Sequence, residues 1–274
     1  MSSSPCADLD STAQRVARIS PARVAIIRGS RLDSSETLLS SLNAIFSHLG
    51  IPVLSVSEVQ ANGIERIEEL EYDVLGFLGL PEEFSFFKQT RSREDGPIAL
   101  AFVPKTRSAD SRRFIKMTSA VVLCNSDADY SNISNVLFHF FESLVVPSIL
   151  NIDLADVRRI AKGIGLAFDL EDNEPSGIIA RLPDSSLVAR SALLHFSCSQ
   201  DVRLSEVYSI SKAIALKRGS DEDINIERHS DARRLVRKVN VKIGIRIREN
   251  EGLLAQDNHM GAKRIRMTAI MFGL

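Results

Sequence analysis

The chain has 274 residues, 44% of them hydrophobic, so it is long enough to bury a substantial core in one or two domains. Its net charge of −1 and isoelectric point near 6.5 give no overall attraction to nucleic acid or to an anionic membrane, and we expect neither as a partner. Three cysteines, an odd number far apart in the sequence, argue against a disulfide framework and favour a cytoplasmic location.

The N-terminal segment 1–20 is polar and rich in serine, and we expect a disordered tail without a signal sequence. The most apolar window, VLFHFFESLVVPSIL, contains a histidine, a glutamate and a proline. A membrane-spanning helix needs about 20 largely uninterrupted apolar residues. We therefore expect no membrane span.

The first half of the chain alternates short apolar runs with polar or helical connections. Continuous apolar runs are typical of parallel strands that are covered on both faces. A helix is predicted after the first run, with leucine, isoleucine and phenylalanine at helical spacing over 38–49 and Gly50 at its end. This pattern predicts a Rossmann-like α/β domain over 21–130 with a doubly wound, mostly parallel sheet. Its expected strands are 23–29, 51–56, 72–79, 97–103 and 119–125.

A long apolar helix is predicted over 131–150, buried between two layers. A loop and a second helix follow over 151–175. The remainder, 176–274, is predicted to form an α+β domain. Its expected elements are strands at 191–199, 239–249 and 263–274 and a helix at 203–216. In the second of these strands, apolar residues alternate with polar ones, which indicates one covered and one polar face.

Two groups of residues are candidates for function. Asn151, Asp153 and Asp156 lie within six positions just before a helix, where an acidic residue can cap the helix at about 1 kcal/mol. Ligands of parallel sheets bind at the carboxyl ends of the strands. That edge holds the second candidate group, a possible nucleotide-binding set made of Gly29, Ser30, Lys105 and Asn125.

Two blocks of sequence carry a resemblance to a known family of proteins. The first is LVVPSILNIDLADVRRIAKGIGLAF (144–168), in which the NIDLADV loop follows a long helix with a proline near its end. The second comprises SALLHFSCSQDVRLSEVYSISKAI (191–214) and the closing strand RIRMTAIMFGL (264–274). Together these blocks, which cover about half the chain, resemble the FtsZ branch of the tubulin superfamily. The resemblance implies an FtsZ-type nucleotide domain, here trimmed, joined by the central helix to an FtsZ-type C-terminal domain.

The resemblance also implies a function for the loop. Subunits of this family stack head to tail, and the loop of one subunit enters the nucleotide pocket of the next. By this resemblance Asp153 and Asp156 would polarise the water that attacks the γ-phosphate, and Asn151 would hold the loop or contact the ligand. Phosphoryl transfer depends mainly on positioning and electrostatics, so carboxylates suit that task. The implied ligand is GTP or GDP with Mg²⁺, and the implied partner is a second copy or a genuine FtsZ.

The sequence departs from the family in the loops that bind phosphate. Residues 1–150 contain six glycines, none adjacent to another, whereas the family has glycine-rich loops there. The segment after the third strand reads LPEEFSFFKQTRSRED, in which Glu82 and Glu83 would repel a triphosphate. Ser131 stands where the family has an aspartate that contacts the base. We therefore expect a pseudo-GTPase of the division or shape cytoskeleton, with a divergent, active GTPase completed between subunits as the alternative.

Some features remain open. The five histidines show no metal spacing, so we expect no metal site. An unrelated flavodoxin-like α/β protein fused to an α+β domain is a third hypothesis. A basic cluster is either a solvated face or a site for an acidic partner; it comprises Arg228, Arg233, Arg234, Arg237, Lys238, Lys242, Arg246 and Arg248.

Overall fold

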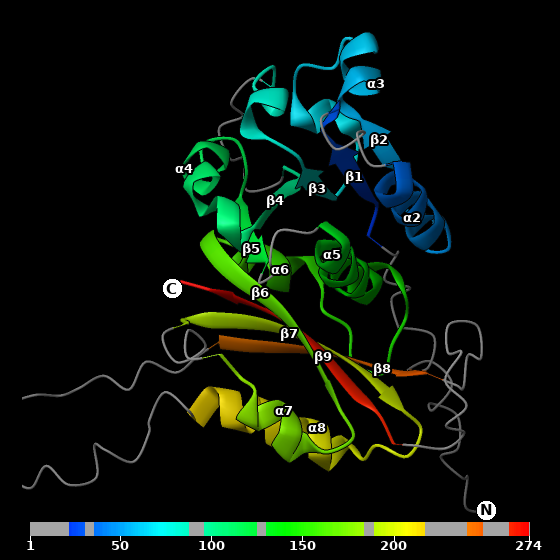
Figure 1. Cartoon of the computed structure of the whole chain (residues 1–274), viewed down its shortest axis with the longest axis vertical. Helices are drawn as coiled ribbons and strands as arrows, with labels where there is room; N and C mark the ends of the chain where they lie inside the picture. The colour runs from blue at the N-terminus through cyan, green and yellow to red at the C-terminus, as the bar shows by residue number, and fades with distance from the viewer. Residues whose placement is uncertain are drawn as a thin grey trace, which may run out of the picture.

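In the computed structural model, the described residues of the chain fold around one sheet of nine strands (Figure 1). The structure describes residues 22–30, 36–87, 96–124, 130–183, 189–216, 240–248 and 263–273. The strands are β1 (Val24–Arg28), β2 (Val53–Ser55), β3 (Val74–Leu78), β4 (Ile98–Pro104), β5 (Ala120–Cys124), β6 (Gly163–Asp172), β7 (Ser191–Ser199), β8 (Asn240–Arg248) and β9 (Ile265–Phe272). The predicted segment 1–20 lies outside the described residues.

The helices connect the strands of both halves. The α-helices are α2 (Glu36–Ser47), α3 (Val56–Ala61), α4 (Ser111–Phe114), α5 (Tyr130–Val145), α6 (Leu154–Ile160), α7 (Pro175–Ala180) and α8 (Leu204–Leu216). The 3₁₀ segments within the described ranges are η2 (Ile67–Leu70), η3 (Pro81–Phe84) and η4 (Lys105–Asp110). None of the helices in these described ranges has the length and hydropathy to cross a membrane.

The strand order is β2-β1-β3-β4-β5-β6-β9-β7-β8, and the pairs from β2 to β6 are all parallel. Helices cover both faces of this first part: α2 and α5 contribute to one hydrophobic cluster, and α3, η3 and α4 to another. The predicted doubly wound α/β part is confirmed. Buried strands explain the continuous apolar runs, because β4 has no exposed face.

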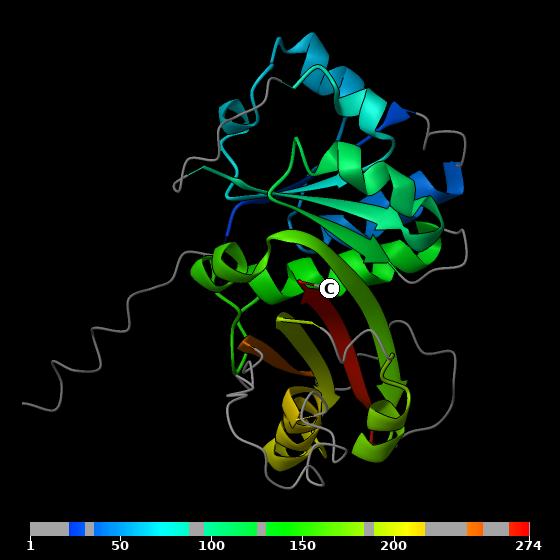
Figure 2. The same cartoon turned by 90° about the vertical axis from the view of Figure 1, so that its left-hand side faces the viewer.

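The strand β6 joins the two parts and was not predicted from sequence. Its first half pairs parallel with β5, and most of its length pairs antiparallel with β9. Figure 2 shows it curving from one part of the sheet into the other. The prediction extended a helix across these residues, but α6 ends at Ile160, and Gly163 adopts a φ of +74° that favours glycine and starts the strand.

The central helix α5 lies between the two parts of the sheet (Figure 1). Phe140 and Phe141 are buried on it, which confirms the predicted position between two layers. The helix ends at Val145 instead of at residue 150. Pro147 accounts for the early end, because proline has no N–H to donate and disfavours a helical conformation in the residue before it.

The second part of the sheet is covered by α7 and α8 on one face and by α5 and α6 on the other. The predicted strands and helix of this part are confirmed, with β7 at the predicted bounds. The alternation along β8 is also observed, since Ile245 is buried against the α8 side. Its polar face, however, packs toward α5 and α6, where Lys242, Arg246 and Arg248 pair with acidic residues of the same chain.

Candidate functional site

The segment 148–156 connects α5 to α6 along the outer edge of β8. The backbone N–H of Ile149 donates to the carbonyl of Ile245 (3.0 Å), and the N–H of Ile245 donates to the carbonyl of Leu150 (2.8 Å). Ile152 is 3% exposed and packs into the core. These contacts fix the loop to the C-terminal part of the sheet next to its polar residues.

Asn151 and Asp153 organise the loop. The Asn151 Oδ1 accepts a hydrogen bond from the backbone N–H of Ser148 at 2.9 Å. Asp153 is the N-cap of α6, with extended backbone, and its Oδ1 accepts from the N–H of Asp156 at 2.6 Å. The capping role expected from the sequence is thus confirmed for Asp153. Its side chain is exposed and makes no ion pair with any described residue.

Asp156 is held by a lysine that the sequence analysis did not connect with it. Its Oδ1 lies 2.5 Å from the Nζ of Lys242 on β8, and the two side chains are 16% and 30% exposed. The ammonium group engages one of the two carboxylate oxygens, so fewer lone pairs of Asp156 are left to accept from water. The pair also attaches the first turn of α6 to the sheet.

At the carboxyl ends of β1 and β3, four residues form what we call the glycine cradle: Gly29, Ser30, Gly79 and Leu80. The carboxylate of Glu83 occupies it. Glu83 Oε2 accepts from the backbone N–H of Leu80 at 2.8 Å, and Oε1 accepts from the hydroxyl of Ser30 at 3.0 Å. The carboxylate thus takes up donors that another anion would need.

The glycines allow this close approach. A Cβ at Gly29 would lie 2.1 Å from the Glu83 Oε2, and one at Gly79 would lie 2.8 Å from the same atom. Gly79 also has a φ of +146°, which side chains disfavour. Glycine-rich loops that bind phosphate also leave their backbone N–H groups open to close approach by an anion. Here the anion against the backbone is a carboxylate of the chain itself.

Of the other predicted ligands, Lys105 lies away from the cradle. Lys105 begins η4 after β4, two strands from β1, which corresponds to about 10 Å. Asn125 lies outside the described residues. Arg113, on the arginine-rich α4 that follows β4, pairs with Glu82, so both acids after the third strand have partners in the chain.

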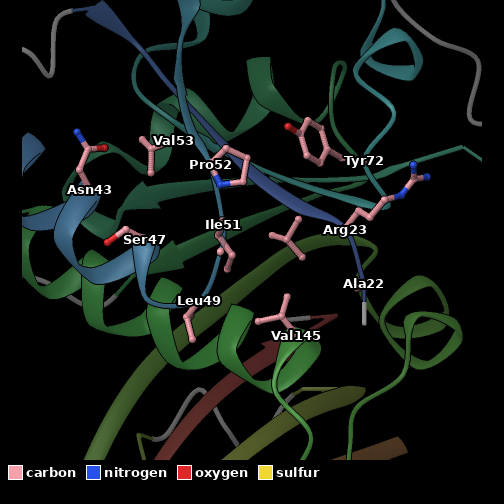
Figure 3. A pocket seen from close by; sticks show the side chains of 12 residues that line it. Ala22, Arg23, Asn43, Ser47, Leu49, Ile51, Pro52, Val53, Tyr72 and Val145 are labelled. Atoms are coloured by element: carbon pink, nitrogen blue, oxygen red, sulfur yellow. The ribbon is translucent and has the colours of Figure 1, made fainter. Parts of the chain in front are cut away.

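A pocket of about 850 Å³ opens at the opposite edge of the sheet (Figure 3). Leu49, Ile51 and Val145 form its apolar side, and Arg23 and Tyr72 lie across from them. Arg23 is paired with Asp73. The pocket lies at the amino ends of β1 and β2, so the length of β1 separates it from the glycine cradle.

The fold is thus a parallel α/β sheet joined by a central helix to an α+β part. Polar residues lie at the carboxyl edge of the parallel sheet and on the loop beside the edge strand β8 of the α+β part. Solved structures with this fold include an empty FtsZ dimer from M. jannaschii (TM-score 0.62, 13% identity, 96% of this chain and 92% of that chain). An FtsZ mutant of the same organism has a TM-score of 0.57 and 14% identity, and the match covers 97% of this chain and 95% of that chain. CetZ from Methanosaeta thermophila has a TM-score of 0.55 and 12% identity, and the match covers 91% of this chain and 86% of that chain.

At such low identity these likenesses concern the fold alone. No family profile matches the chain, and no curated protein matches it in sequence. The fold class expected from the sequence, a doubly wound, mostly parallel α/β sheet joined by a central helix to a C-terminal α+β part, is confirmed, and these FtsZ and CetZ structures share it.

Proposed function

We propose that the chain is a tubulin/FtsZ-like cytoskeletal subunit that associates head to tail but does not use nucleotide in its own site. Its partner is a second copy or a genuine FtsZ, in the cytoplasm, in cell division or cell shape. The observation that carries the proposal is the Glu83 carboxylate in the glycine cradle. The site that would receive GTP and Mg²⁺ in this family already holds an anion supplied by the chain.

The loop that would enter a neighbouring subunit supports the association. It is tied to β8, and the residues just before it, Ile149 and Leu150, are 56% and 48% exposed. Adjacent exposed apolar side chains beside polar residues are typical of protein interfaces. The loop therefore presents an ordered, partly apolar surface, as a head-to-tail contact requires.

The state of the acids supports the loss of hydrolysis. Asp156, one of the two residues that would polarise water, is paired with Lys242, and Asp153 is engaged in capping. At the other face, Glu83 fills the cradle and Glu82 is paired with Arg113. The divergent-GTPase alternative needs both arrangements to open.

Light scattering of a genuine FtsZ during assembly, with and without this protein at equal concentration, tests the association. We expect the protein to change the amplitude or rate of assembly, and we expect the double variant Ile149→Asp, Leu150→Asp to lose that effect. Ile115→Asp is the matched control, because Ile115 is an exposed apolar residue (39%) on the first part of the fold.

Sedimentation velocity of the protein alone tests association between its own copies with the same variants. The absence of an effect on FtsZ together with a monomer at all concentrations would contradict the proposal. An effect that persists undiminished in the double variant would place the contact elsewhere and contradict the assigned face.

A further inference from the structure

A buried cluster of three side chains lies where α5 packs against β7. His139, Glu142 and His195 are 3%, 2% and 3% exposed. His139 and Glu142 are three positions apart and so share a face of α5, while His195 comes from the middle of β7. The Nδ1 of His139 lies 3.5 Å and the Nε2 of His195 lies 3.4 Å from the Glu142 Oε2.

His195 is poorly satisfied in this environment. Neither of its ring nitrogens has a hydrogen-bond partner among the described residues. The 3.4 Å separation from Glu142 is long for a hydrogen bond, which has its most frequent length at about 2.9–3.0 Å. A buried polar group without a partner is costly and rare in native proteins, and a bound water or ion is one explanation for it.

The spacing fits a tetrahedral ion. Zinc binds imidazole nitrogen and carboxylate oxygen at about 2.0–2.2 Å, which places ligand atoms about 3.4 Å apart in a tetrahedron. The two separations from Glu142 Oε2 are 3.5 and 3.4 Å, and the three ligand atoms all lie within 4.8 Å of one another. We propose that His139, Glu142 and His195 bind one Zn²⁺ ion that fastens the central helix α5 to strand β7.

The protonation states suit ligands of a cation. Burial lowers the pKa of His139, which keeps its imidazole neutral and able to coordinate. Burial alone would raise the pKa of Glu142, but its contacts with the two histidines and with Arg248 and Arg246 hold that pKa well below its usual range. Glu142 is therefore a carboxylate at physiological pH.

The two arginines set the limits of the site. Arg246 contacts Oε1 of Glu142, and the Arg248 guanidinium lies 3.4 Å from Oε1 and 3.3 Å from Oε2. Outer contacts of this kind orient a coordinating carboxylate. Their positive charge also weakens the attraction for any dication, so we expect binding of zinc or copper, which lie at the strong end of the affinity series, and none of Mg²⁺ or Mn²⁺.

This proposal revises the expectation of no metal site. The two histidines are far apart in the sequence, and only the i, i+3 pair of His139 and Glu142 was visible there. The topology places β7 beneath α5 and so brings the third ligand to the pair. An ion at this point would stabilise the junction between the two parts of the fold.

Zinc content and affinity of the full chain test the site. After treatment with a chelator, the protein is titrated with Zn²⁺ by calorimetry, and bound metal is counted by mass spectrometry after dialysis. We expect one zinc per chain and a higher melting temperature with zinc. His195→Gln should weaken binding at least tenfold. His48→Gln is the matched control, because His48 is exposed and is not a member of the cluster, and should bind as the wild type does.

Wild-type protein that takes up no zinc would overturn the proposal, as would a folded His195→Gln that binds zinc as tightly as the wild type. If that variant does not fold, Co²⁺ added to the wild type decides. Intense visible absorption typical of tetrahedral Co²⁺ supports the site, and the weak spectrum of octahedral Co²⁺ contradicts it. If the cluster is held together only by its own hydrogen bonds and by the two arginines, the weak octahedral spectrum is the one observed.

Discussion

Removal of the Glu83 charge should convert the glycine cradle into an anion site. In the wild type, a phosphate can approach Gly29 and the Leu80 N–H only after the Glu83 carboxylate has moved aside. The displaced carboxylate would still lie about 4 Å away, where two unit charges repel by about 4 kcal/mol at an effective dielectric constant of about 20. Glu83 is half-buried, so solvent screening roughly halves this figure.

A difference of about 2 kcal/mol corresponds to about 30-fold in affinity. We therefore expect Glu83→Ala to bind inorganic pyrophosphate about 30-fold more tightly than the wild type, measured by calorimetry. Glu83→Gln should gain less, because its amide keeps the bulk of the side chain in the cradle. Loss of the acceptor for the Leu80 N–H should cost Glu83→Ala about 1 kcal/mol of folding free energy.

Glu206→Gln is the control for the loss of one negative charge. Glu206 accepts a hydrogen bond from the N–H of Arg203, three positions before it, at 2.9 Å. Glu83 makes the same kind of contact with Leu80, but Glu206 lies in the second part of the fold. If folded Glu83→Ala binds pyrophosphate no more tightly than the wild type and Glu206→Gln do, the Glu83 carboxylate does not exclude anions from the cradle. Glu83 would then be a structural cap and not the occupant of an anion site.

Three further predictions concern stability and reactivity. Asp153→Ala should lower the free energy of unfolding by about 1 kcal/mol in urea titrations, with Asp153→Asn close to the wild type, because either residue caps α6. Cys124 and Cys198 should not react with a thiol reagent until the protein unfolds, because both thiols are buried. Burial raises the pKa of Cys198 to about 12 and also raises the pKa of Cys124. The contact with Lys263 lowers the pKa of Glu206. The stability that this carboxylate contributes should therefore be present above about pH 4.5 and be lost as the pH falls further. The urea midpoints of Glu206→Gln and the wild type should converge in acid.

Much of the fold was predictable because its signals are local. Apolar runs gave the strands β1 to β5, and the alternation along β8 gave its two faces. The strand β6 was missed because its apolar residues follow α6 directly and can extend a helical pattern as well as a strand. Only the pairing of β6 with both β5 and β9, set by the whole sheet, decides between these structures.

The candidate site was predictable in its residue types and not in its contacts. The sequence indicated that Glu83 would oppose a triphosphate, but not that its carboxylate would lie on Gly29 and Gly79. The pairing of Asp156 with Lys242 depends on β8 being the edge strand beside the loop. Such contacts come from topology, which joins residues far apart in the chain. Residues 228, 233, 234, 237 and 238 of the predicted basic cluster lie outside the described ranges.

Equilibrium binding of a fluorescent GTP analogue to the wild-type protein, with Mg²⁺ present, shows whether Glu83 keeps nucleotide out of the glycine cradle. We expect no saturable binding up to about 100 μM, a limit that corresponds to a binding free energy of about −5.5 kcal/mol. Binding in the micromolar range that GTP competes for and ATP does not would contradict this expectation. That result would restore an active nucleotide site and require Glu83 to leave the glycine cradle when nucleotide binds.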